Sequence, residues 1–252
     1  MKLKSRLWQI QLAALLLLAT VAFYLLRWQL FPTAVEHREM LRYIVGDVAF
    51  LFLQVLLVTV VIDGVTQHRQ KEDMKRKLNM VVGAFFSQAG TELLGQIAST
   101  DATLGEIREL LVARASWKPE DYRYARLAFA SHEGRIDLGS CDLVALRNIL
   151  GEQKPYILGL LGNQSLLEHE QFTDLLWAVT HLAEELVVRP ELTGLPASDL
   201  AHLTGDTKRA YLLLGTQWLD YLAHLQTNYP YLFSLALRTN PLDPEATVVV
   251  SA

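Results

Sequence analysis

The sequence predicts an all-α integral membrane protein, with an N-terminal two-span transmembrane helical hairpin and a cytoplasmic helical bundle domain after it. Two strongly apolar segments near the N-terminus and the amphipathic stretches that follow lead to this prediction. No window alternates apolar and polar residues as a strand would. We expect four parts: a transmembrane hairpin at 1–64, a stalk and membrane-proximal apolar helix at 65–99, the helical domain at 100–239 and a mobile tail at 240–252.

The two predicted spans cover about 7–30 and 44–62. Leu12–Leu26 reads LAALLLLATVAFYLL and Val48–Ile62 reads VAFLFLQVLLVTVVI. About 20 helical residues of this kind cross a bilayer. A secretory signal is the alternative for the first segment, but its apolar run is longer than a normal signal core.

Basic residues beside the spans predict the orientation. They are concentrated after the second segment, at Arg69, Lys71, Lys75, Arg76 and Lys77. Because basic flanks stay in the cytoplasm, both termini are expected there, with the protein in the inner membrane of a prokaryotic cell. The same five side chains could contact anionic lipid headgroups.

Helix signals divide the remaining chain. A capping box at Thr103–Glu106, Pro119 and Ser140 are expected to begin short helices, and two longer helices are expected at about 166–188 and 196–226. The apolar stretch 78–98 has helical spacing but lacks the Lys/Arg face of membrane-surface helices. It is therefore expected inside the bundle, with the membrane surface as the alternative.

Three polar residues of the second span are candidates for a pore or a helix interface: Asp47, Gln54 and Thr59. Asp47 and Gln54 are seven residues apart and share a helix face. A ring of chains could line a cation pathway with them. We favour the interface, because a single Gln commonly joins neighbouring spans through hydrogen bonds.

Histidines with nearby carboxylates form the other candidate site. The residues are His181, Glu184, Glu185, Asp199, His202 and His224. Helical di-metal proteins use Glu-x-x-His pairs, and that motif is absent here. Placement on polar helix faces explains these residues without a metal, so no metal or other cofactor is expected.

The functional prediction is a membrane-anchored, oligomeric scaffold or regulatory protein that presents its helical domain to partners. An oligomeric ion channel lined by the second span is the alternative, and a membrane-bound metalloenzyme with His and carboxylate ligands is the third. The expected partners are the lipid bilayer, further copies of the chain, and another membrane or cytoplasmic protein. No phosphate loop, HExxH or GxSxG motif supports an enzyme, and the net charge of −4 without a basic face argues against nucleic acid.

Overall fold

The structure is a computed structural model that describes residues 18, 21, 22, 25, 26, 28, 29, 34–139, 141–163, 166 and 169–249. These residues are mostly helical, as predicted, and the one β-bridge between them joins Asp101 to Ile136. The chain divides into two compact units, Met1–Gln70 and Lys71–Ala252.

The prediction of an integral membrane protein is overturned. Crossing a bilayer takes about 20 predominantly apolar residues in one helix, and no helix in the described part of the chain has the required length and apolarity. Most of 7–30 lies outside the described residues. Residues 44–62 belong to α2 (Ala34–Phe85), which also contains the charged stretch 67–77. The prediction of a span considered 44–62 by itself, whereas in the structure this segment and the charged stretch belong to one longer helix.

The predicted inner-membrane location depended on the spans and is corrected with them. It followed only from the apolar segments, and the described helices do not support a two-span protein. The lipid bilayer as a partner and the pore and lipid-headgroup sites had the same premise and stay predictions. Asp47, Gln54, Arg69, Lys75, Arg76 and Lys77 are exposed on α2, whereas the side chains of Thr59 and Lys71 lie outside the described set.

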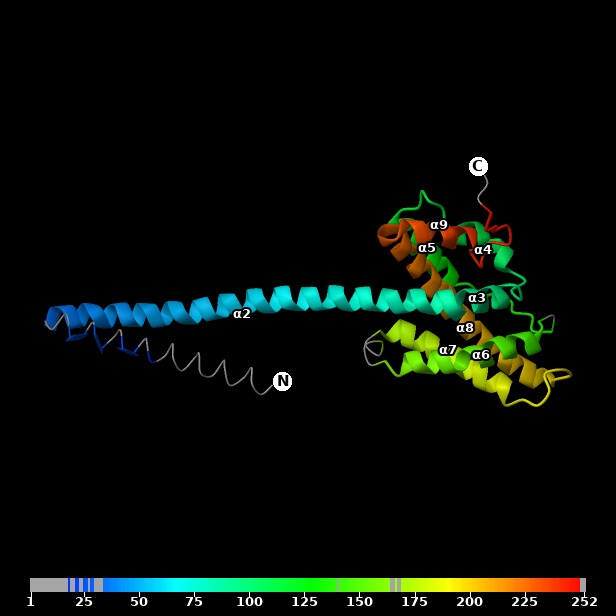
Figure 1. The fold of residues 1–252 in the computed structure, drawn as a ribbon, viewed down its shortest axis with the longest axis horizontal. Helices are drawn as coiled ribbons and strands as arrows, with labels where there is room; N and C mark the ends of the chain where they lie inside the picture. The colour runs from blue at the N-terminus through cyan, green and yellow to red at the C-terminus, as the bar shows by residue number, and fades with distance from the viewer. Residues whose placement is uncertain are drawn as a thin grey trace. The chain divides into compact units, whose positions relative to one another are not determined.

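The second unit is a bundle arranged around one long helix, α8 (Ala197–Asn228). Helix α8 packs against α3, α5, α7 and α9, and α6 lies beside α7 (Figure 1). The remaining elements are η1 (Phe86–Gly90), α3 (Thr91–Ala98), α4 (Leu104–Leu111), α5 (Pro119–Ala130), α6 (Leu143–Leu161), α7 (Glu170–Val187) and α9 (Pro230–Arg238). Apolar stripes of these helices meet in one core, in which Trp218 and Tyr211 are the largest fully buried side chains.

Several helix ends differ from the sequence signals. Helix α5 begins at Pro119, as predicted. The hydroxyl of Thr103 makes no capping bond and instead donates to Asp101 Oδ1. Asp142 caps α6, because its carboxylate accepts from the backbone N–H groups of Val144 and Ala145. Ser140, the predicted cap, lies outside the described residues.

The stretch 78–98 lies in the core of the bundle, so the membrane-surface alternative is wrong. Val82, Phe85, Phe86, Leu93 and Ile97 are all buried. The stretch is not one regular α-helix, because the π-helical turn η1 interrupts it. A Cβ on Gly90 would lie 2.6 Å from the Phe85 ring, so only glycine fits where the two phenylalanines fold over this turn.

The segment after α9 is partly anchored, although the sequence predicted a mobile tail. The Trp218 indole N–H donates to Asn240 Oδ1 at 3.1 Å. Leu242 is buried and its backbone N–H donates to the same oxygen. The predicted tail therefore begins with a turn that packs against Trp218 of α8.

Candidate metal centre

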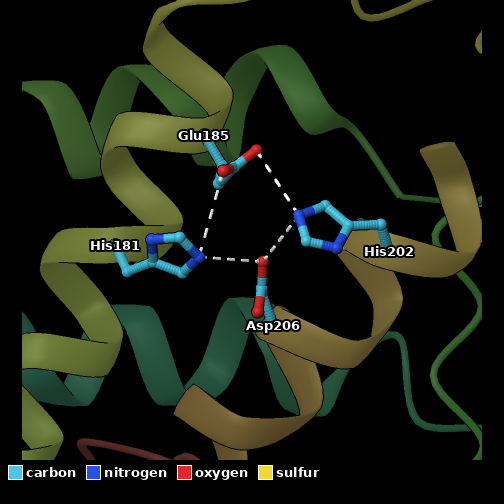
Figure 2. Close-up of side chains that lie close together, drawn as sticks. All are labelled: His181, Glu185, His202 and Asp206. Atoms are coloured by element: carbon cyan, nitrogen blue, oxygen red, sulfur yellow. Dashed lines mark ion pairs between the residues drawn. The ribbon is translucent and has the colours of Figure 1, made fainter.

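Two histidines and two carboxylates from α7 and α8 converge on one point (Figure 2). His181 and Glu185 come from α7, and His202 and Asp206 come from α8. Asp206 Oδ2 lies 3.2 Å from His181 Nε2 and 3.3 Å from His202 Nε2. Glu185 Oε1 lies 3.9 Å from His181 Nε2, and Glu185 Oε2 lies 3.7 Å from His202 Nε2. These four contacts form a closed ring.

Local sequence places each pair on one helix face. Residues four apart in a helix are neighbours on its surface, and each helix supplies a histidine followed four residues later by a carboxylate. Burial of Leu182 on α7 and Leu203 on α8 turns these faces toward each other. The connecting loop reverses the chain at Gly194, whose φ of 68° is in the left-handed region that favours glycine.

Asp206 is the buried member of the cluster. It is 6% exposed, and its Oδ2 has no hydrogen-bond donor. Both imidazole nitrogens are near enough to interact with it electrostatically, but neither meets the angular requirements of a hydrogen bond. A buried oxygen without a donor normally costs stability, so its position between two nitrogen ligands indicates a cation that would satisfy it.

The spacing of the four ligand atoms fits a metal ion. They all lie within 4.8 Å of one another. A tetrahedral site with bonds of about 2.0–2.1 Å separates neighbouring ligand atoms by about 3.3 Å. The two contacts to Asp206 Oδ2 already have that length, whereas the two contacts to Glu185 are about half an ångström longer and come from different oxygens. The Glu185 side chain would therefore have to move to bring one oxygen toward both histidines.

Two arginines contact the carboxylates of the centre. Arg189 Nη1 donates to Glu185 Oε2 at 2.6 Å, and Arg209 Nη1 lies 3.5 Å from Asp206 Oδ1. The hydrogen bond from Arg189 holds the pKa of Glu185 below its ordinary value, so this ligand is ionised at neutral pH. Such an outer-sphere hydrogen bond orients a ligating carboxylate in metal proteins, which is the role of Arg189 toward Glu185.

The structure unites only part of the predicted metal set. His181, Glu185 and His202 belong to the centre. Glu184 pairs instead with Lys154 on α6 at 3.2 Å. The carboxylate of Asp199 binds Arg189 at 2.7 and 3.0 Å.

His224 belongs to a separate arrangement on α8. Its Nδ1 accepts from the side-chain amides of Asn79 and Asn228, at 2.9 and 3.1 Å. Burial lowers the pKa of His224, which favours the neutral ring that this acceptor role requires. His224 is therefore not a ligand of the cluster.

Sequence reasoning missed Asp206, the most buried ligand. His202 was paired with Asp199, three residues before it, and not with Asp206, four residues after it. The signal was the four-residue spacing, since His202 precedes Asp206 just as His181 precedes Glu185. Two such pairs on consecutive helices would have identified the complete set.

A second buried polar group, outside this centre, was also missed. Asp101 Oδ1 accepts from the N–H and hydroxyl of Thr103 and from the N–H of Arg135. Asp101 Oδ2 lies 2.7 Å from His132 Nε2, which must carry the proton because an ionised carboxylate can only accept. Every oxygen is satisfied, so this group ties the end of α3 to the loop after α5 and leaves no position for a ligand.

The fold and the cluster together define the class of protein: a helical-bundle protein with a candidate transition-metal centre between two consecutive helices. The chain belongs to the family of the MJ1433 protein. The family's N-terminal helical domain matches residues 3–65, and its C-terminal helical domain matches residues 74–238.

A relative in Methanocaldococcus jannaschii, described as uncharacterized protein MJ1433, is 44% identical to this chain over 209 residues. That alignment covers 83% of this chain and 84% of the relative. No solved structure matches the chain. All four residues of the candidate centre lie within the range of the C-terminal helical domain.

Proposed function

We propose that this protein binds a divalent first-row transition-metal ion, Zn²⁺ foremost, between α7 and α8. The single observation that supports this most strongly is Asp206 Oδ2, a buried oxygen without a hydrogen-bond donor between two imidazole nitrogens. An aspartate that only packed the bundle would be expected to have a donor for this atom.

The donor set discriminates between metals. Imidazole nitrogens suit Zn²⁺, Fe²⁺, Ni²⁺ and Cu²⁺, whereas Mg²⁺ and Ca²⁺ prefer spheres of oxygen alone. His181 and His202 supply two nitrogens, and Glu185 and Asp206 supply two oxygens. Zn²⁺ commonly binds four ligands of these two types, His nitrogens and carboxylate oxygens.

The ion would cross-link two helices of the helical domain. It joins α7 to α8 across the loop 188–196, and α8 packs against most other helices of the bundle. An ion that binds only the folded state stabilises that state by mass action. Metal occupancy would thereby regulate how firmly the bundle presents its surface to a partner, which is the role we propose for the ion.

Titration of metal-free, tag-free protein with Zn²⁺ tests the proposal. We expect one ion per chain by calorimetry, and an increase in the free energy of unfolding of about 2.7 kcal/mol at a free Zn²⁺ concentration 100 times the Kd. His181→Ala and His202→Ala should remove this binding, while Mg²⁺ should not compete. Unchanged zinc binding in both variants would contradict the proposed ligands.

Self-assembly through α2 is a second candidate function. Among the described side chains of α2, several large apolar ones are exposed, including Phe50 and Leu57. Exposed apolar surface of this kind commonly marks an interaction site. If copies associate there, the double variant Phe50→Ser/Leu57→Ser should lower the mass measured by light scattering. An unchanged mass would argue against this interface.

A further inference from the structure

We propose that the metal centre binds a small oxyanion, a carboxylate or phosphate group, on its solvent side, held jointly by the metal ion and Arg209. This inference rests on the proposed metal binding. It adds a ligand class to the site and gives Arg209 the role of an anion-binding residue.

The centre is buried on one side and open on the other. Asp206 closes the buried side with a side chain that is 6% exposed, whereas the side chains of His181 and His202 are 45% and 54% exposed. An ion bound to their Nε2 atoms would therefore be reachable from solvent. Zinc sites with an accessible position take water or an exogenous ligand there and can expand to five-coordinate.

Charge in the site favours an anion. Glu185 and Asp206 together neutralise a divalent ion. Arg189 is neutralised by Asp199, to which it donates at 2.7 and 3.0 Å. The guanidinium of Arg209 remains, so the loaded site keeps one uncompensated positive charge beside the metal.

Arg209 is positioned to contact a metal-bound ligand. Its Nη1 lies 3.5 Å from Asp206 Oδ1, on the carboxylate whose other oxygen points into the centre. At this distance the pair makes no close hydrogen bond, and the Arg209 side chain is 64% exposed. The guanidinium therefore keeps donors available for a second carboxylate or phosphate, the groups that its planar fork binds best.

Arg209 and an ion bound by Asp206 would contact the two oxygens of one carboxylate. A metal ion and a guanidinium can share one oxyanion when about 5 Å separates them, since a metal–oxygen bond spans about 2 Å and a hydrogen bond about 3 Å. A neutral ligand would gain the metal bond but not the charge-assisted hydrogen bonds. We therefore expect the site to prefer an oxyanion to a neutral ligand of the same size.

Cobalt substitution separates this inference from metal binding itself. Tag-free, metal-free protein is loaded with one equivalent of Co²⁺, whose visible bands report its coordination, and is then titrated separately with acetate and with inorganic phosphate. Acetamide serves as the neutral counterpart of acetate. We expect saturable changes in the bands with at least one oxyanion and none with acetamide.

Arg209→Gln should weaken oxyanion binding about tenfold, the loss typical of one charge-assisted hydrogen bond, while its Co²⁺ affinity stays within a few-fold of the original. Arg123→Gln, at an exposed arginine on α5, is the matched control and should change neither. The preferred anion shows whether the natural ligand is carboxylate-like or phosphate-like.

The outcomes distinguish metal binding from oxyanion binding. Absence of bound Co²⁺ would overturn the metal centre and the oxyanion site together. Bound Co²⁺ with bands that no oxyanion changes would overturn the oxyanion site alone. Equal oxyanion affinity in Arg209→Gln and the original protein would overturn the role of Arg209.

Discussion

The Arg189 guanidinium donates two hydrogen bonds to the Asp199 carboxylate, from Nε at 3.0 Å and from Nη2 at 2.7 Å. This pair joins the end of α7 to the first turn of α8 across their connecting loop. The remaining Nη1 of Arg189 donates to the Glu185 carboxylate. Closure of the loop and orientation of a proposed metal ligand therefore depend on the same side chain.

The Asp199→Asn substitution should weaken zinc binding without removing a ligand. The neutral amide loses most of its attraction for Arg189, so Arg189 holds Glu185 less firmly. Outer-sphere changes of this kind lower metal affinity about 10- to 100-fold. Competition with a chromophoric chelator measures the affinity. An unchanged affinity would show that Arg189 positions Glu185 without help from Asp199.

Asp206→Asn should separate metal binding from folding. We expect zinc affinity to fall by more than about 100-fold, beyond the range of outer-sphere effects. The free energy of unfolding of the metal-free protein should fall by no more than about 1 kcal/mol, or rise, because the exchange removes a buried charge whose Oδ2 lacks a donor. Calorimetric titration and urea unfolding in chelator give the two values. A large loss of metal-free stability would instead assign Asp206 a structural role.

Two adjacent glutamates on α7 provide a matched comparison. Glu185 faces the centre, whereas Glu184 pairs with Lys154 and is largely exposed. Glu185→Gln should reduce zinc affinity at least tenfold, because an amide is a much poorer ligand than a carboxylate. Glu184→Gln should leave it unchanged. Similar losses in both variants would indicate that charge on α7, and not coordination, attracts the metal.

Asp101 should contribute stability that disappears in acid. Burial raises its pKa, but the hydrogen bonds from Thr103 and the contact with His132 outweigh burial and keep the pKa below its ordinary value. The contribution is therefore complete above the unfolded pKa of about 3.9 and is lost as the pH falls through the lower folded pKa.

Comparison with Asp101→Asn tests whether the stabilisation by Asp101 is lost, and not gained, as the pH falls. At neutral pH the variant should be about 1–3 kcal/mol less stable, because buried hydrogen bonds lose their charged acceptor. The difference should shrink as the pH is lowered toward about 2. Urea unfolding over a pH series measures it. A difference that grows in acid would mean that Asp101 is protonated in the folded state.

Substitution of alanine at two glycines of α8 should change the free energy of unfolding in opposite directions. A Cβ at Gly215 would lie 2.0 Å from the ring of Phe129, a fully buried side chain. We expect Gly215→Ala to cost about 1–3 kcal/mol or more through overpacking. A Cβ at Gly205 meets nothing within 4 Å.

Gly205→Ala is therefore the control and should add about 0.5–1 kcal/mol, because alanine loses less backbone freedom in a helix. Thermal unfolding in chelator compares both variants without metal effects. If Gly215→Ala were neutral, the close contact between α5 and α8 would not be as tight as the structure shows.

The sequence alone was sufficient for features set by neighbours along the chain. The helical content, the start of α5 at Pro119 and the pairing of His181 with Glu185 follow from spacing and from the backbone chemistry of proline. These interactions act within one or two helical turns, so no knowledge of packing is needed to infer them. The burial of 78–98 also followed, because an apolar stretch without a basic face has to pack against protein.

Tertiary structure decided the rest. Asp199 and Asp206 are seven residues apart and share one face of α8, so which of them joins His181 depended on how far along α7 each of them lies. Asp199, in the first turn of α8, pairs with Arg189 beyond the end of α7, while Asp206, two turns further on, lies against His181. The spans were predicted wrongly for a related reason. The hydropathy of a segment does not show how far its helix extends or which other residues that helix contains. Local spacing thus determined the two halves of the centre, and long-range packing of the helices determined that they meet.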